Sequence, residues 1–88
     1  MKITGDQVAQ KLFDYLANRI SVEQLVDWAE TLMMDAEIDD PHVETVVDII
    51  ARLGLADVKE FGITWDDCKD FLARLGYRVN VSISKMAA

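Results

Sequence analysis

Apolar and polar residues follow a helical period through most of the chain before residue 77, and the widest apolar surface lies within Ile20–Met34. Apolar positions there cover well over half of the helix circumference, which predicts a central helix buried against several neighbours. Ser21 and Gln24 have the spacing of a capping box at its start. Trp28 is interpreted as a core residue of this helix; the alternative is an exposed anchor for a partner.

A similar pattern predicts a helix before the central one. Thr4 and Gln7 form a second capping-box pattern, and apolar residues follow at helical spacing as far as Asn18. Only Arg19 and Ile20 then remain to join the two helices. Because the link is so short, the two helices are predicted to be antiparallel neighbours.

A third helix is predicted between a proline and a glycine. Asp39 or Asp40 can cap its start, with Pro41 in the first turn, where a missing amide costs nothing. Gly54 is predicted to end it in the left-handed conformation. Adjacent β-branched valines leave a strand open as an alternative for Val46–Ile50, but the Asp-Pro start and the glycine favour a helix.

The following segments predict one short helix and a fourth main helix. Leu55–Phe61 has room for one or two helical turns before Gly62. Thr64 then begins the fourth helix, with Asp67 at the capping-box position. Gly76 is predicted to end this helix.

Tyr77–Ser84 alternates apolar and polar residues, which predicts a half-buried C-terminal strand. A lone strand leaves its amides and carbonyls unpaired, so it must pair with Met1–Ile3, with a second copy or with a partner protein. Lys85–Ala88 is predicted to be a flexible tail. The predicted fold class is therefore mostly α. It is a small bundle of four main helices plus one short helix and a C-terminal β-strand, in a single helical domain over residues 1–84.

Charge is the feature of the composition that changes this picture most. The chain has 88 residues, 51% of them hydrophobic, which argues against disorder, and its net charge is −7. Ile20–Ala51 holds nine acidic residues and no Lys or Arg, whereas the remainder has seven acids and nine bases. The negative field therefore comes from one contiguous part of the chain. Nucleic acid requires the opposite sign, so this charge favours a basic protein as partner.

The sequence also predicts a cytoplasmic protein that binds no membrane. No apolar run approaches the ~20 residues of a membrane-spanning helix, and the first residues, MKITGDQV, lack the hydrophobic region of a signal peptide. An interfacial helix would need a basic polar face, whereas the polar faces here are acidic. The single cysteine, Cys68, excludes an internal disulfide and fits a reducing compartment.

Few residues are candidates for chemistry. His42, the only histidine, lies near a helix start with no identifiable nucleophile, and Cys68 lies on an apolar helix face, as a buried thiol would. Asp35, Glu37 and Asp39 resemble the start of a calcium loop, but the later glycine and glutamate of an EF-hand are missing. At most a weak adventitious cation site is expected there. We therefore expect no catalytic, cofactor or metal site, and no enzyme.

Two rows of acidic residues remain as candidates for function. One row lies along a face of the central helix. In the other row, Asp40, Glu44 and Asp48 are each four residues apart. Like charges at this spacing destabilise a helix by a few tenths of a kcal/mol per pair, and no base is interleaved. The rows are interpreted either as solvated faces or as an acidic surface kept for a basic partner. The second interpretation predicts a partner-binding site at Glu37, Asp39, Asp40, Glu44 and Asp48.

Two stretches resemble known proteins. KLFDYLANRISVEQLVDWAE, at residues 11–30, resembles the early helix–turn–helix of small bacterial immunity proteins of the colicin type, in which an apolar helix is followed by an I-S-x-E-x motif and a second amphipathic helix. This resemblance implies a cytoplasmic helical inhibitor that fills the basic active site of a nuclease toxin with carboxylates. DVKEFGITWDDCKDFLARLG, at residues 57–76, also resembles a segment of small uncharacterised bacterial proteins.

These observations lead to two expectations of function. The first is a non-enzymatic inhibitor of the immunity or antitoxin kind, which blocks a basic, nuclease-like partner. The alternative is a homodimeric structural or regulatory module that pairs through Tyr77–Ser84 across a two-fold axis. The acidic residues and the predicted strand lie in different parts of the chain, so they point to different surfaces.

Overall fold

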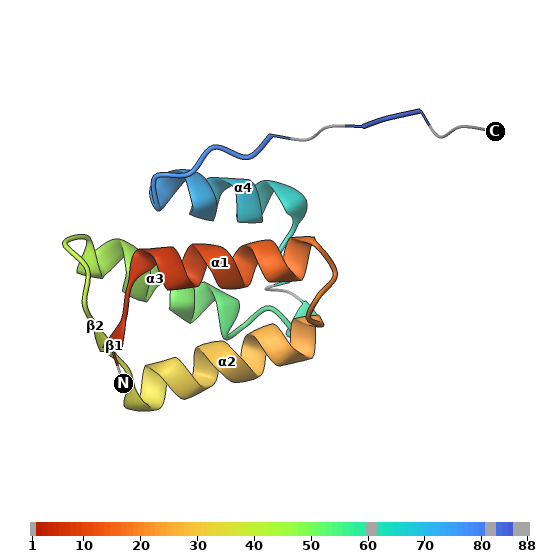
Figure 1. Cartoon of the computed structure of the whole chain (residues 1–88). Helices are drawn as coiled ribbons and strands as arrows, with labels where there is room; N and C mark the ends of the chain where they lie inside the picture. The colour runs from red at the N-terminus through yellow and green to blue at the C-terminus, as the bar shows by residue number, and fades with distance from the viewer. Residues whose placement is uncertain (1, 60–61, 81–82, 86–88) are drawn as a thin grey trace.

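Four helices and a minimal sheet make up the domain in the computed structural model, which describes residues 2–59, 62–80 and 83–85. Figure 1 shows their arrangement, which confirms the prediction of a mostly helical fold with four main helices. In chain order the elements are β1 (Lys2–Ile3), α1 (Gly5–Leu16), α2 (Val22–Asp35), β2 (Glu37–Ile38), α3 (Val43–Leu53) and α4 (Trp65–Arg74). Within the described residues, no helix is long and apolar enough to cross a membrane.

Three of the helices begin with a complete capping box, as predicted from the sequence. In each box a hydroxyl accepts from the backbone amide three residues later, at 3.1 to 3.3 Å, and that residue's side chain accepts from the amide of the cap residue. These reciprocal bonds satisfy two amides that a helix start otherwise leaves free. The boxes pair Thr4 with Gln7, Ser21 with Gln24 and Thr64 with Asp67.

Helix α1 is the centre of the fold and contacts each of the other three helices. It runs antiparallel to α2, as the short link predicted, while α4 covers its other side and α3 lies behind it (Figure 1). The apolar stripes of the four helices meet in one core, whose largest fully buried side chains include Leu12, Leu25, Ile49 and Leu53. Trp28 is partly buried against this core, and the Lys11 ammonium lies over its ring at 5.4 Å.

The N-terminal residues form a strand, but not with the partner that the sequence suggested. β1 pairs in parallel with β2, in the register Lys2 to Glu37 and Ile3 to Ile38. The amide of Asp39 also donates to the carbonyl of Ile3, at 2.8 Å. Ile3 is 4% exposed, so this pairing anchors the chain start on the core. Lys2 and Ile3 thus form a short strand, and Met1 lies outside the described residues.

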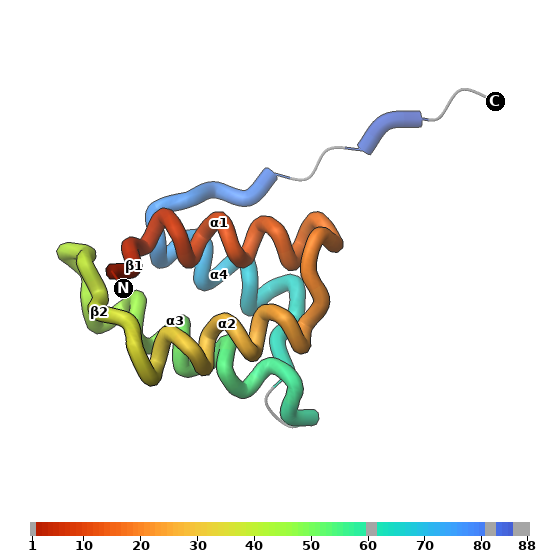
Figure 2. The backbone as a smooth tube through the Cα atoms, turned by 60° about the horizontal axis from the view of Figure 1, so that its bottom comes forward, coloured from red at the N-terminus to blue at the C-terminus, as the bar shows by residue number. Residues whose placement is uncertain are grey.

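The C-terminal segment differs from the predicted strand. Residues 77–80 and 83–85 form no strand, and Val81 and Ser82 lie outside the described residues. Instead, the Tyr77 hydroxyl donates to the Asp6 carboxylate and Val79 packs on the core beside α1. Figure 2 shows this segment running along α1 and then away from the helices. An alternating pattern fixes only which side chains share a face, and here that face lies on a helix.

The structure also tests two predicted helix ends and one predicted strand alternative. Gly76 follows α4 with a φ of 94°, which confirms the predicted left-handed stop. Gly54 was predicted to do the same but is right-handed, with φ −65° and ψ −15°. It is buried, and a Cβ on it would lie 2.7 Å from the Met33 Cε atom, the flexible end of an α2 side chain. Val46–Ile50 lies within α3, which excludes the strand alternative.

The predicted short helix at Leu55–Phe61 is only partly within the described residues. Leu55, Ala56 and Val58 each donate to the carbonyl three residues earlier, at 3.0 to 3.2 Å, so this stretch consists of tight turns. Glu60 and Phe61, where the segment was predicted to end, lie outside the described residues. The tail predicted at Lys85–Ala88 is described only at Lys85, which is exposed.

Candidate functional site

The five acidic residues predicted to bind a partner lie on one continuous stretch of structure. Glu37 is in β2, Asp39 and Asp40 are in the loop that follows, and Glu44 and Asp48 are on α3. All are exposed except Asp40, which is partly buried. The fold therefore places these residues next to one another along the chain path, but it gives them unequal freedom.

Asp40 is held by the fold through both of its oxygens. Its Oδ1 accepts from the His42 amide and its Oδ2 from the Gly5 amide, each at 2.8 Å. These two amides, His42 first, lower the pKa of the carboxyl against the opposing effect of burial, and the nearby His42 adds slightly. Because Gly5 begins α1 and His42 precedes α3, one carboxylate fastens two helix starts together. The sequence predicted Asp39 or Asp40 as the cap of the third helix, with Pro41 in its first turn, but α3 begins at Val43 with His42 as its N-cap and without a side-chain capping bond. The bond of Asp40 to the start of the first helix was not predicted.

Asp48 is paired with a cation of this same chain. Its Oδ2 accepts from the Arg74 guanidinium at 2.9 Å, which joins α3 to α4. The two residues are 26 positions apart, so spacing in the sequence could not reveal the pair. A surface pair of this kind contributes little to stability, but it neutralises one of the five predicted site residues.

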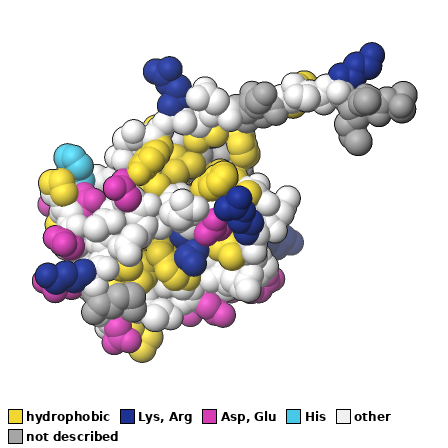
Figure 3. Space-filling view, in the orientation of Figure 1, with side chains coloured by type: hydrophobic (Ala, Val, Ile, Leu, Met, Phe, Trp, Pro, Cys, Tyr) yellow, Lys and Arg dark blue, Asp and Glu magenta, His cyan; other side chains and the backbone are white. Residues whose placement is uncertain are grey.

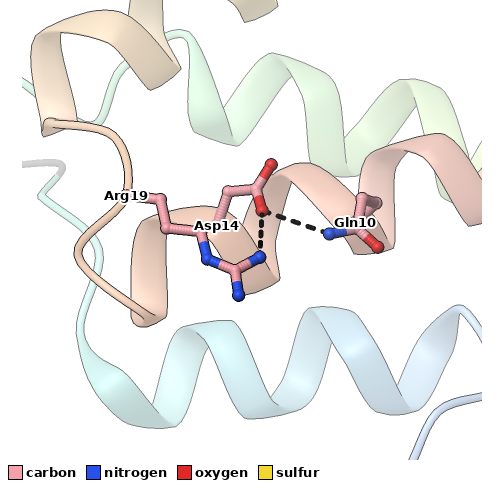
Figure 4. Close-up of polar contacts among 3 residues, drawn as sticks. All are labelled: Gln10, Asp14 and Arg19. Atoms are coloured by element: carbon pink, nitrogen blue, oxygen red, sulfur yellow. Dashed lines mark hydrogen bonds and ion pairs between the residues drawn. The ribbon is translucent and has the colours of Figure 1, made fainter.

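Arg19, which directly precedes the acidic part of the chain, forms its contacts outside that part. Arg19 donates to Asp14 at 3.4 Å, and Gln10 donates to the same carboxylate oxygen at 3.1 Å (Figure 4). The Arg19 guanidinium also lies 5.1 Å from the centre of the Phe13 ring. These contacts hold Arg19 on α1, so its charge does not offset the carboxylates of α2 and α3.

The remaining carboxylates of residues 20–51 extend freely from the surface. On α2 these are Glu23, Asp27, Glu30 and Asp35, all exposed. Within residues 2–59, 62–80 and 83–85, no side chain forms an ion pair or hydrogen bond with these carboxylates. The same holds for the carboxylates of Glu37, Asp39 and Glu44. Figure 3 shows acidic side chains along the α2 and β2 edges of one face. The described structure therefore carries unpaired negative charge on both helices.

The two residues considered for chemistry, His42 and Cys68, lie on different helices. His42 is exposed at the start of α3, and its side chain makes no capping bond. Cys68 is 1% exposed on α4; burial, helped by the charge of Asp67, raises the pKa of its thiol to about 11. The thiol is therefore protonated near neutral pH, and the prediction of a buried structural cysteine is confirmed. Among the described residues, no cluster of three or more His, Cys, Asp or Glu side chains is arranged to hold a metal ion.

A hollow of about 370 Å³ lies where the C-terminal segment passes over α1. Both apolar and polar residues line it: Asp6, Ala9, Gln10, Phe13, Leu16, Leu72, Tyr77, Arg78, Val79 and Asn80. The Tyr77 hydroxyl points to Asp6, and that bond raises the pKa of the phenol, with smaller contributions from burial and the Asp6 charge. Here too the polar groups serve packing.

Comparison with known proteins gives no relative: no protein-family model, curated protein or solved structure matches this chain. A function for this domain is therefore inferred from its surface.

Proposed function

We propose that this domain is a non-enzymatic acidic protein-binding domain, an inhibitor of the immunity or antitoxin kind that blocks a basic, nuclease-like partner. The observation that supports it is the set of exposed carboxylates at Glu37, Asp39 and Glu44, which no cation in the described residues neutralises. The colicin-type resemblance at residues 11–30 favours the same class of function.

The mechanism is electrostatic. A basic groove that binds phosphates attracts carboxylates at similar spacing, and the bound acidic surface then excludes the nucleic acid. Long-range attraction between the two surfaces accelerates association and makes it sensitive to salt. Asp40 and Asp48 contribute less to this recognition, because Asp40 already accepts from two backbone amides and Asp48 is paired with Arg74.

The test is a charge reversal that spares the fold. The variant Glu37→Lys, Asp39→Lys and Glu44→Lys changes exposed side chains whose carboxylates have no partner among the described residues. Its matched control reverses three exposed acids elsewhere, Asp57, Asp66 and Asp70, so that the net charge changes equally. Circular dichroism is used to check that both variants remain folded.

Binding is measured against a basic protein captured on the wild-type domain from the host lysate and eluted along a salt gradient. We expect the site variant to weaken affinity by about tenfold or more, 1.4 kcal/mol, and to flatten its salt dependence. The control should lose much less. Equal effects of the two triple variants, or no effect of either, would exclude the proposed surface.

A second candidate function is a homodimer formed through the C-terminal segment. Ile83 is 91% exposed on a segment that leaves the helices, and β1 already has β2 as a partner. In this proposal Tyr77–Ser84 pairs as a strand with the same segment of a second copy. Sedimentation equilibrium at high micromolar concentration should then show a dimer that Ile83→Asp dissociates and Ser84→Asp does not. A monomer at that concentration would eliminate this candidate.

A further inference from the structure

An apolar groove runs between α2 and α3, on the side where both helices carry their free carboxylates. Its volume is about 170 Å³. Met33 of α2 and Val47 of α3 stand on its two walls and are 54% and 49% exposed, although both are apolar. Its lining consists of Leu32, Met33, Ala36, Ile38, Val47, Ile50 and Ala51.

Acidic residues border this groove on both walls. Glu30 precedes Met33 by three residues on α2, and Glu44 precedes Val47 by three residues on α3. Side chains three apart are neighbours on a helix surface, so each exposed apolar side chain has a carboxylate beside it. The groove therefore has an apolar floor and negative rims.

The charge of the rims decides between possible occupants. A second copy of this domain, placed groove to groove, would bring Glu30 and Glu44 against the same carboxylates, and like charges facing each other oppose that contact. An apolar side-chain row flanked by Lys or Arg is complementary instead. That pattern belongs to a basic amphipathic helix, which binds such grooves through apolar residues at i, i+3, i+4 and i+7.

We infer that the groove between α2 and α3 docks a basic amphipathic helix of a partner protein. Apolar side chains of that helix enter between Met33 and Val47, and its Lys or Arg side chains meet Glu30 and Glu44. The inference rests on the proposed function, since it takes the partner to be basic, and it specifies which part of the partner is bound.

Two synthetic peptides and two matched variants test the inference. The probe is a Leu/Lys peptide of about 18 residues, five helical turns, patterned as an amphipathic helix; its control has the same composition in scrambled order. The groove variant is Val47→Glu. The matched control is Val58→Glu, because Val58 is also exposed, at 37%, but does not line the groove. Binding is followed by fluorescence anisotropy at low and moderate salt.

We expect the patterned peptide to bind about tenfold more tightly than the scrambled one, and Val47→Glu to remove that advantage. Val47→Glu adds negative charge, which by itself attracts a basic peptide more strongly. A loss of affinity in this variant therefore reports the loss of apolar contact. Val58→Glu should keep the wild-type preference.

Three outcomes would overturn the inference in distinguishable ways. Equal, salt-sensitive binding of both peptides, with no loss in Val47→Glu, would remove the groove but leave the proposed acidic function standing. No binding of either peptide at low salt would remove both. A dimer in sedimentation experiments that Val47→Glu dissociates and Val58→Glu does not would identify a second copy as the occupant. Patterned binding that depends on Val47 but not on salt would support the groove and contradict the electrostatic function.

Discussion

Removal of the Cys68 thiol should change how the stability of the domain depends on pH. The thiol is 1% exposed, and burial, with a contribution from Asp67, raises its pKa from an ordinary 9.0 to about 11. A group whose pKa is higher in the folded state stabilises the fold fully at pH values below its unfolded pKa. As the pH rises from 9 to 11, the unfolded chain loses this proton first, and the stabilisation disappears.

The size of the effect follows from the two pKa values. Each pKa unit corresponds to about 1.4 kcal/mol, so two units set an upper limit of about 2.7 kcal/mol. Water reaches ionised groups readily in a domain this small, so we expect about half of that limit, about 1.4 kcal/mol. Cys68→Ala should cost about 1 kcal/mol at pH 7, because it deletes one buried heavy atom. Between pH 9 and 11 the wild type should lose that advantage.

Urea unfolding of the wild type and Cys68→Ala, under reducing conditions from pH 7 to 11, measures the difference directly. All other ionisable groups are present in both proteins, so their effects cancel in the difference. The two free energies of unfolding should converge as the pH rises. A difference that stays constant from pH 7 to 11 would show that the thiol is not buried as the structure has it.

Two glycines and one carboxylate support further predictions. Gly76→Ala should cost about 1–2 kcal/mol in urea unfolding, because its φ of 94° suits only glycine and no atom lies within 4 Å of an added Cβ. Gly54→Ala should instead be neutral or stabilising, by up to about 1 kcal/mol, if the flexible end of Met33 moves aside; a larger loss in Gly54→Ala than in Gly76→Ala would contradict both conformations. Asp40→Asn should lower the melting temperature at pH 7. Since the Asp40 pKa is lowered in the fold, its stabilisation is present above the ordinary value of 3.8 and is lost as the pH falls below it, so melting curves of the two proteins should approach each other in acid. Melting temperatures that differ equally at pH 7 and in acid would show that the two amides do not stabilise the carboxylate.

The helices could be predicted because their signals are local. In a capping box such as Ser21 and Gln24, each side chain accepts a hydrogen bond from the other residue's backbone amide. Both bonds form within one turn and need nothing from the rest of the chain. The apolar period then fixes which face of each helix is buried. Gly76 belongs to the same class, because a left-handed turn is a property of the residue that adopts it.

Features that depend on distant parts of the chain were not predictable. Gly54 looked like a helix stop in the sequence, but its missing side chain serves contact with Met33 of another helix. β1 and β2 are two residues each, too short for any periodicity, and only the path of α1 and α2 brings them together. The alternation after Gly76 predicted a strand with Tyr77, Val79 and Ile83 on one face, whereas Val79 packs on the core, Tyr77 is half-exposed and Ile83 is 91% exposed. An alternating pattern could not indicate that the surface beneath this segment is α1.

The predicted acidic site likewise combines features visible in the sequence with features that depend on distant contacts. Those contacts reduce the number of carboxylates that are free to bind a partner. Charge counted along the sequence made all five predicted carboxylates equivalent, whereas the fold uses Asp40 to join two helix starts and pairs Asp48 with Arg74. A carboxylate that already accepts two amides, or one already bound to a cation, has less to gain from a basic partner. The negative charge available for recognition therefore lies at Glu37, Asp39 and Glu44, together with the row on α2. Because α2 and α3, which carry part of this charge, also form the walls of an apolar groove, a partner that is both basic and amphipathic would gain more from this surface than one that is only basic.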